Sequence, residues 1–242
     1  MGAGVYPDLD RPFNVLAYLG RVMFNPFALG ISERNKRLNY SCKHRHNGID
    51  HHACFDKDNH LNERVGYYDI ETSNLNADFG IVLSYCILPD KNNRLLSRTI
   101  TPEELRSDKF DKNLLKQFCE DARKFDRLIG YYSAKFDAPF LRTRCIFHHL
   151  DFPIYKEINH TDAYLTAKHK LKLHSRRLGV VAPFFGIKAK GHPLNGAIWL
   201  KCLRGDKRAL DFVTTHNKED VYSLREVWHK VEDYQRLTKT SL

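Results

Sequence analysis

The sequence lacks a long hydrophobic run, since no segment approaches the roughly 18 consecutive apolar residues that a membrane-spanning helix needs. Residues 1–10 also lack the basic start and apolar stretch of a secretory signal. Internal repeats and low-complexity segments are absent, and the ordinary globular composition excludes collagen, coiled coil and wholesale disorder. These absences predict no membrane partner and a cytoplasmic location, in a prokaryotic cell or in the host if the source is viral.

Cysteines are few and do not form a disulfide pattern. Six occur in 242 residues, and four of them lie among apolar neighbours, as in Tyr85-Cys86-Ile87. This setting is typical of reduced core cysteines in an intracellular protein. Cys42 and Cys54 differ because histidines surround them.

Acidic residues are outnumbered, with 29 Asp and Glu against 39 Lys and Arg, which gives a net charge of +10. The excess is local, because residues 142–208 contain fourteen basic and four acidic side chains. A basic face of this kind favours a polyanionic partner. The alternative is a solvated surface that serves solubility alone.

Periodicity divides the chain into two parts. Residues 1–63 keep no sustained pattern and predict an irregular N-terminal extension with at most short helices. From residue 64 the pattern predicts strands at 65–71, 80–88, 95–100 and 128–132. Helices are predicted to start at 101 and to cover 114–125, 139–148, 163–172, 178–185 and, as one or two helices, 207–230. Residues 64–242 are therefore expected to form one α/β domain with a central mixed β-sheet flanked by helices.

Paired carboxylates lie at the end of the first predicted strand. Asp69 and Glu71 are two residues apart and so point to the same face of the strand. Adjacent carboxylates repel each other, and a bound divalent cation removes that cost. A solvent-facing strand edge is the alternative, but the aromatic neighbours Tyr67 and Tyr68 draw the segment inward.

Three further polar residues are candidates for a functional site because of their positions on predicted elements. Asp137 follows a predicted strand and begins a helix, where a plain helix-capping role is the alternative. His216 and Asp220 are four residues apart and share one face of a predicted helix. That spacing can place a metal ligand beside a general base, and an ordinary surface pair is the alternative.

Taken in order, the segments Asp-Ile-Glu-Thr at 69–72, Phe-Asp-Ala-Pro-Phe-Leu at 136–141 and His-Asn-Lys-Glu-Asp-Val at 216–221 resemble the DEDD superfamily of RNase H-like 3′–5′ exonucleases. They are most similar to the predicted RNase H-like exonuclease group related to the proofreading domains of family B polymerases. The resemblance covers about residues 64 to 235. Two departures stand out: His216 occupies the register of a family tyrosine, and Tyr132 stands where an asparagine is frequent.

This resemblance implies a hydrolase that removes nucleotides from the 3′ end of DNA or RNA with two Mg²⁺ or Mn²⁺ ions. Asp69, Glu71 and Asp220 would hold the ion that activates water, Asp69 and Asp137 the ion beside the leaving 3′ oxygen, and His216 would accept or steer the proton of the water. Single-stranded 3′ ends are the expected substrate. The alternatives are a non-catalytic nucleic-acid-binding module and a structure-selective endonuclease on the same fold. No polymerase motifs follow, so a polymerase or another replication or repair protein would be a separate partner.

The basic excess then has a role, because Lys and Arg can follow a phosphate backbone into the site without reading sequence. An aromatic side chain there can stack a terminal base. The predicted nucleic-acid-binding residues are Tyr132, Arg142, Arg144, Lys170, Arg176, Arg177, Lys188 and Lys190.

A second cluster of metal-type ligands lies in the N-terminal extension, between residues 42 and 54. Cys42 with His44, and His51 with Cys54, form two close pairs separated by six residues. Structural zinc sites use four such ligands. The segment thus predicts a zinc knuckle, with His46 and His52 as alternate ligands, and a His-rich solvated linker is the alternative.

Overall fold

The computed structural model describes residues 29–59, 61, 63–188 and 195–235. The chain forms two compact units, Met1–Asn62 and Glu63–Leu242, and their boundary lies one residue before the predicted domain boundary. In its described part, the N-terminal unit holds two short helices, α1 (Ile31–Leu38) and α2 (His52–Asp58). No helix in the described ranges combines the length and the apolar character needed to cross a membrane.

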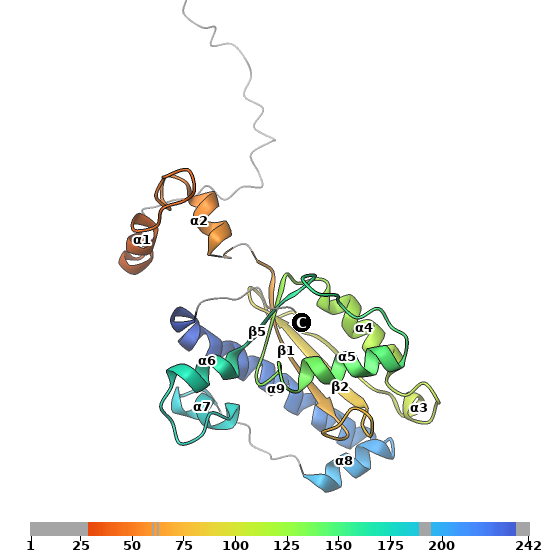
Figure 1. Cartoon of the computed structure of the whole chain (residues 1–242). Helices are drawn as coiled ribbons and strands as arrows, with labels where there is room; N and C mark the ends of the chain where they lie inside the picture. Colours follow the sequence, from red (N-terminus) through yellow and green to blue (C-terminus); the bar gives the residue numbers. More distant parts are fainter. Residues whose placement is uncertain (1–28, 60, 62, 189–194, 236–242) are drawn as a thin grey trace, which may run out of the picture. The chain divides into compact units, whose positions relative to one another are not determined.

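A mixed five-stranded sheet forms the centre of the second unit, with the strand order β3-β2-β1-β4-β5 (Figure 1). Its strands are β1 (Val65–Thr72), β2 (Val82–Pro89), β3 (Leu96–Thr99), β4 (Arg127–Gly130) and β5 (Asn159–Asp162). β2 pairs antiparallel with β1 and β3, whereas β4 pairs parallel with β1 and β5. The predicted α/β class with a central mixed sheet is confirmed, and β5 is a strand that the sequence pattern did not predict.

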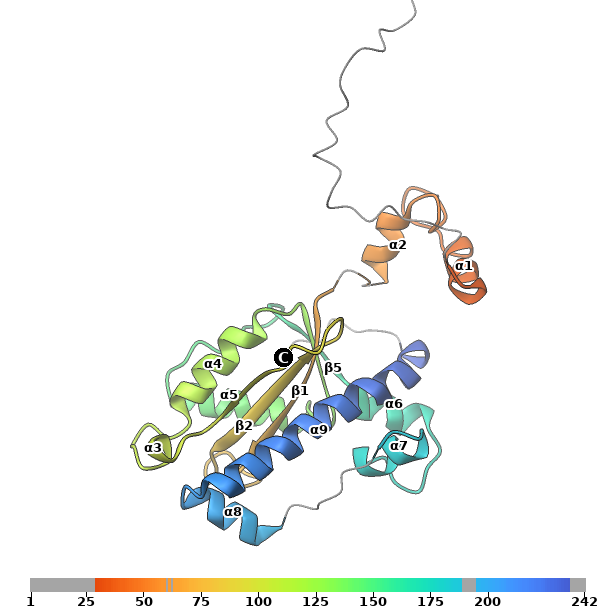
Figure 2. The same cartoon turned by 180° about the vertical axis from the view of Figure 1, so that it is seen from behind.

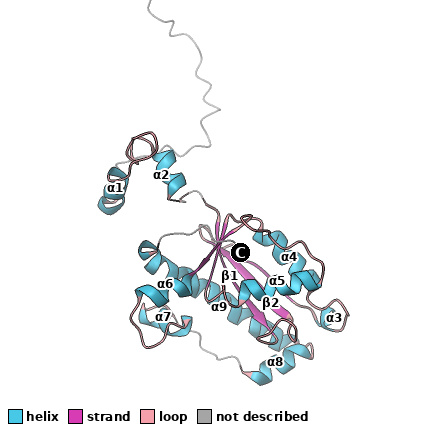
Figure 3. Ribbon diagram, in the orientation of Figure 1, coloured by secondary structure: helices cyan, strands magenta, loops and turns pink. Residues whose placement is uncertain are grey.

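Helices cover both faces of this sheet (Figure 3). They are α3 (Pro102–Leu105), α4 (Lys112–Ala122), α5 (Asp137–Phe147), α6 (Ala163–Lys170), α7 (Leu178–Phe184), α8 (Gly196–Leu203) and α9 (Lys207–Val231), followed by the 3₁₀ turn η3 (Glu232–Tyr234). Helices α4 and α5 lie on one side of the sheet, and α9 crosses the other side (Figure 2). The predicted 207–230 segment is one 25-residue helix, and α8 was not predicted.

Alternation along β1 assigns its side chains to the two faces. Tyr68 and Ile70 belong to the large core that includes residues of α4 and α5. Tyr67 belongs instead to a second core with Leu224 and Trp228 of α9. Side chains at positions 69 and 71 share the face of Tyr67, so the strand presents its two carboxylates toward the side on which α9 lies.

Candidate active site

The carboxylates of β1 lie at its C-terminal end, on the central strand of the sheet. Asp69 and Glu71 are partly buried, and Ile70 between them is buried on the opposite face. In the β1–β2 register they stand opposite Cys86 and Ser84, both fully buried. Their position is therefore fixed by the core beneath them rather than by a surface loop.

Helix α9 brings the last motif to these carboxylates. Asn217 donates from Nδ2 to the backbone oxygen of Asp69 at 3.3 Å, which ties the helix to the strand. His216 and Asp220 lie one turn apart on the same helix. One ligand atom each from Glu71, His216 and Asp220 lie within 4.8 Å of one another. The structure thus brings together residues that the sequence separates widely.

Asp137 is the first residue of α5 and joins the group from another element. The N-cap position belongs to Phe136, so Asp137 is not the capping residue. Its side chain is buried, and Oδ1 accepts a hydrogen bond from the backbone amide of Ile70 at 3.2 Å. Burial first, and then the charge of Asp69, raise the pKa of Asp137 well above its usual value.

This arrangement fits divalent cations. The raised pKa of Asp137 reflects negative charge that is gathered in a buried place, and a cation would offset it. The donor set is four carboxylates and one imidazole, and carboxylate oxygen suits Mg²⁺ and Mn²⁺. The residues that could hold the ions are Asp69, Glu71, Asp137, Asp220 and His216.

A pocket of about 360 Å³ opens beside the carboxylates. Asp69 and Asp220 line it together with Tyr131 and Ser223. Helix α7 supplies the remaining wall through Leu178, Gly179 and Ala182. Acidic groups and an aromatic ring therefore face the same space, which is the size of an ordinary small-ligand site.

Asp162 supports the site, and sequence reasoning missed it. It ends β5 and accepts hydrogen bonds from the backbone amides of Tyr132 at 2.8 Å, Ala134 at 3.1 Å and Tyr164 at 3.0 Å. These bonds hold Tyr132 in the left-handed region, at φ 63°. The Thr-Asp-Ala start of a helix signals the cap to Tyr164, but no local pattern signals the other two bonds. Burial raises the pKa of Asp162.

The turn after β4 aims two tyrosines differently. Tyr131 lines the pocket, and its hydroxyl donates to the backbone oxygen of Arg176. Tyr132 is 44% exposed, and its ring stands edge-on to that of Tyr164, with centroids 5.0 Å apart. A side chain at Gly130 would place Cβ 2.3 Å from Ser133, so this close turn requires glycine.

The predicted basic residues divide into exposed and buried members. Lys170 lies at the end of α6, Arg177 directly precedes α7 and Lys188 follows it, and all three are exposed. Arg142 is exposed on α5, whereas Arg176 is partly buried. Lys190 lies outside the described residues. Of this group, Arg176 and Arg177 are next in sequence to the α7 residues that line the pocket.

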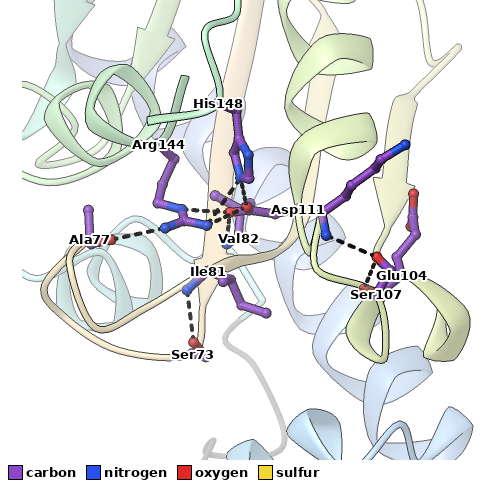
Figure 4. A network of polar contacts seen from close by, with 10 residues as sticks. Ser73, Ala77, Ile81, Val82, Glu104, Ser107, Asp111, Arg144 and His148 are labelled. Atoms are coloured by element: carbon purple, nitrogen blue, oxygen red, sulfur yellow. Dashed lines mark hydrogen bonds and ion pairs between the residues drawn. The ribbon is translucent and has the colours of Figure 1, made fainter. Parts of the chain in front are cut away.

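Arg144 corrects the prediction, because it is not available to a nucleic acid. Its guanidinium is buried and donates to both oxygens of Asp111, from Nη2 at 2.7 Å and from Nε at 3.0 Å. His148 and the backbone amide of Val82 contact the same carboxylate, at 2.8 and 2.9 Å (Figure 4). Arg144 also reaches the backbone oxygen of Ala77 in the β1–β2 loop. The prediction that Arg144 contacts phosphate was wrong. The spacing of basic residues along the sequence cannot distinguish a buried arginine from an exposed one.

The predicted zinc ligands lie in the other unit. Cys42, His44, His51 and Cys54 each offer a ligand atom within 4.8 Å of the others. His46 and His52, the alternates, are exposed and do not belong to this group.

Comparison with known proteins agrees with this fold. A family model described as RNase_H superfamily matches residues 66–232, a span that contains all five candidate catalytic residues. The structure of the family B DNA polymerase from the hyperthermophilic archaeon Pyrobaculum calidifontis is similar with a TM-score of 0.58 and 16% identity. The match covers 71% of this chain and 25% of the polymerase, so the chain spans about a quarter of that protein's length. No curated protein matches the chain. The resemblance that the three motifs indicate is confirmed, and the chain belongs to the RNase_H superfamily.

Proposed function

We propose that the chain is a metal-dependent 3′–5′ exonuclease that hydrolyses phosphodiester bonds of DNA or RNA at single-stranded 3′ ends. The observation that carries the proposal is the convergence of acidic groups from three elements. Glu71, His216 and Asp220 approach one another within 4.8 Å, and Asp69 and Asp220 line one pocket. Asp137 adds a buried carboxylate that Asp69 repels. A binding module without catalysis has no need of this repulsion.

The carboxylates would hold two Mg²⁺ or Mn²⁺ ions. Asp69, Glu71 and Asp220 are assigned to one ion, and Asp69 with Asp137 to the other. Two such ions, when bound, supply an activated water and charge stabilisation for an in-line displacement at phosphorus. Without cations, burial and then the charge of Asp69 favour a proton on Asp137. Loading of the site therefore releases that proton, and metal affinity should rise with pH.

His216 has the proton-transfer role in this proposal. It lies within reach of Glu71 and Asp220, on the same helical face as Asp220. An imidazole has an ordinary pKa of about 6.5, which suits acceptance of a proton from water near neutral pH. Glu71 and Asp220 lie close enough to interact with the positive charge that the ring then carries.

The pocket and the residues next to α7 would receive the strand. Tyr131 offers a ring on which a terminal base can stack, and Leu178 and Ala182 give the pocket an apolar side. Arg177, directly before α7, and Lys188, in the loop after it, are exposed and can contact phosphates. A polymerase or another replication or repair protein is the partner that such an activity would serve.

The test uses single-stranded DNA and RNA oligonucleotides labelled at the 5′ end, with Mg²⁺ or Mn²⁺. The wild-type chain should give a ladder that shortens from the 3′ end, and chelation or Asp220→Asn should abolish it. Glu219→Gln is the matched control, because Glu219 is the exposed neighbour on the same helix. The sugar that supports the ladder identifies the substrate.

Two other outcomes would overturn the proposal. Cleavage that persists when the 3′ end is blocked would indicate a structure-selective endonuclease. Salt-sensitive binding without cleavage in either metal would indicate a binding module.

A further inference from the structure

The Cys/His cluster of the N-terminal unit is built from a tight turn and a helix start. Cys42 donates its backbone amide to the oxygen of His46 at 3.0 Å, and the amide of Arg45 donates to the oxygen of Cys42 at 2.8 Å. Arg45 takes a left-handed conformation, with φ 66°, to close this turn. His51 directly precedes α2, and Cys54 lies in its first turn. Two ligands thus come from the turn and two from the helix start.

The four candidate ligand groups gather around one point, and one ligand atom from each lies within 4.8 Å of the others. Nδ1 of His44 and Nδ1 of His51 are 3.3 Å apart. Sγ of Cys42 lies 3.8 Å from the first nitrogen and 3.5 Å from the second. Sγ of Cys54 lies 3.7 Å from Nδ1 of His44 and 3.9 Å from Nε2 of His51.

Zinc bond lengths account for these separations. With Zn–N near 2.0–2.1 Å and Zn–S near 2.3 Å, tetrahedral angles separate two nitrogens by about 3.3 Å and a nitrogen from a sulfur by about 3.6 Å. With Nδ1 as the ligand atom of both histidines, the N–N distance is 3.3 Å, Sγ of Cys42 lies 3.8 and 3.5 Å from the two nitrogens, and Sγ of Cys54 lies 3.7 Å from that of His44. These separations fit a zinc ion bound through Nδ1 of both histidines and Sγ of Cys42, and Cys54 offers the fourth ligand within 4.8 Å of the others.

The described part of the N-terminal unit has a very small apolar core. Among its described residues, the buried apolar side chains are only those of Cys42 and Phe55. Arg37 completes this small core, with its guanidinium 4.3 Å from the ring centroid of Phe55 and 2.9 Å from Asp56. A core of this size does not stabilise a fold alone, and small domains commonly rely on a structural metal.

The two clusters of the chain differ in the ions that they select. Thiolate and imidazole ligands favour zinc, whereas the carboxylates of the candidate active site favour Mg²⁺ or Mn²⁺. Four protein ligands also close the coordination sphere, which is the mark of a structural and not a catalytic zinc site. The N-terminal cluster lies outside the segment matched by the family model, so this site is an addition to the shared fold.

We propose that Cys42, His44, His51 and Cys54 bind one structural zinc ion that folds the N-terminal unit. The proposal does not depend on the exonuclease proposal, because its ligands and its readout are separate. His46 and His52 are not ligands and provide matched histidine controls.

The first experiment measures zinc in the full-length chain purified without chelators. One zinc per chain is expected in the wild type and in His46→Ala, His52→Ala and Asp220→Asn. Cys42→Ser together with Cys54→Ser should abolish zinc binding. Asp220→Asn separates this site from the carboxylates, because a zinc lost with Asp220 would belong to the candidate active site.

A second experiment does not depend on the folding of a ligand-deleted variant. Cobalt replaces zinc, and the thiolate-to-cobalt charge-transfer absorption counts the sulfur ligands. His44→Cys should keep the metal and raise that absorption by about half, because three thiolates replace two. The same substitution at His46 should leave the absorption unchanged.

Four results would overturn the proposal. In the first, the wild-type chain takes up neither zinc nor tetrahedral cobalt. In the second, zinc is retained after both cysteines are replaced, and in the third, a control variant loses zinc. In the fourth, His44→Cys adds no thiolate absorption.

Discussion

The two metal-type clusters of this chain are held in opposite ways. The oxygen-rich cluster takes its ligands from β1, α5 and α9, which lie far apart in sequence and share a large apolar core. The sulfur and nitrogen cluster takes its ligands from residues 42–54, around a core of few side chains. The first cluster depends on a fold that exists without the ion. In the second, on the zinc proposal, the ion would be part of the fold.

This contrast separates activity from stability. Carboxylates gathered on a stable scaffold repel one another, so the scaffold tolerates a cost that the ion relieves on binding. Thiolates and imidazoles around zinc supply contacts that the small unit lacks otherwise. Loss of a ligand should therefore affect catalysis at the first site and folding at the second.

The largest expected effect is the unfolding of the N-terminal unit on zinc removal. Chelation should remove hydrogen-exchange protection from the amides of α2 and of the turn at 42–46, because zinc contributes on the order of 10 kcal/mol to such folds. The amides of β1 and β2 should keep their protection. Added zinc should restore the lost protection, and added Mg²⁺ should not. Unchanged protection in both units after chelation would remove the distinction between the sites.

The next effect concerns Asp137, which accepts from the backbone amide of Ile70 and faces the charge of Asp69. Asp137→Asn should lower the rate of phosphodiester hydrolysis at least about a thousandfold, the loss of several kcal/mol of charge stabilisation. Its metal-free stability at neutral pH should hold or rise, because burial and Asp69 disfavour a charge at this position, and a neutral amide carries none while its oxygen can still accept from Ile70. Rate assays and thermal unfolding in chelator measure the two results.

Asp162→Asn is the matched control for this prediction. Asp162 is also buried, but three amides donate to its two oxygens. An amide nitrogen cannot accept from Ala134, so this variant should lose about 1–3 kcal/mol of unfolding free energy. If Asp137→Asn were the less stable of the two variants, the carboxylates of the site would be structural, and the contrast between the clusters would fail.

Sequence patterns placed the candidate acidic residues on the right elements because each lies in a local pattern. Alternation in β1 and helical spacing in α9 placed Asp69, Glu71, His216 and Asp220 correctly on their elements. Strand β5 was not predicted, because its residues, Asn159 to Asp162, are polar and are buried only through pairing with β4. Asp162 escaped with it, since two of its three partners are about thirty residues away.

The error at Arg144 has a related cause. Charge spacing reports where a basic residue lies along the chain, but a buried acidic partner such as Asp111 decides whether it faces the solvent. Asp111 precedes α4 and carries no local mark of burial. Strand alternation and helical periodicity therefore predict on which face of its element a residue lies. They do not predict its partner in an ion pair with a residue distant in sequence.

The third effect concerns the stability of the second unit without metal. It tests whether the buried ion pair of Arg144 with Asp111 contributes to that stability. Arg144→Met should cost about 3–5 kcal/mol of unfolding free energy, because it leaves the carboxylate of Asp111 buried and poorly paired. Arg142→Met, an exposed change two residues away on the same helix, should stay within about 0.5 kcal/mol. Urea unfolding of the full chain in chelator measures both. Equal effects would mean that the Asp111 network does not stabilise the scaffold.

The smallest effect concerns a histidine between carboxylates that is not a metal site. His229, near the end of α9, uses Nε2 toward Asp90 at 3.1 Å and Nδ1 toward Glu232 at 3.2 Å. Both nitrogens are occupied, so the ring acts as a bridging cation. The Asp90 and Glu232 carboxylates raise the pKa of His229 to about 10.

The sign of its contribution follows from that shift. The folded pKa exceeds the unfolded value of about 6.5, so the stabilisation is complete below pH 6.5 and is lost as the pH rises toward 10. His229→Gln should flatten the stability profile in that window by less than about 1 kcal/mol, because the pair is 40% exposed at the histidine. Its hydrolysis rate should equal that of the wild type, whereas His216→Gln should slow hydrolysis about a hundredfold. If both variants lost the same rate, the position of His216 beside Glu71 and Asp220 would not distinguish it from His229. The assignment of His216 to proton transfer would then fail.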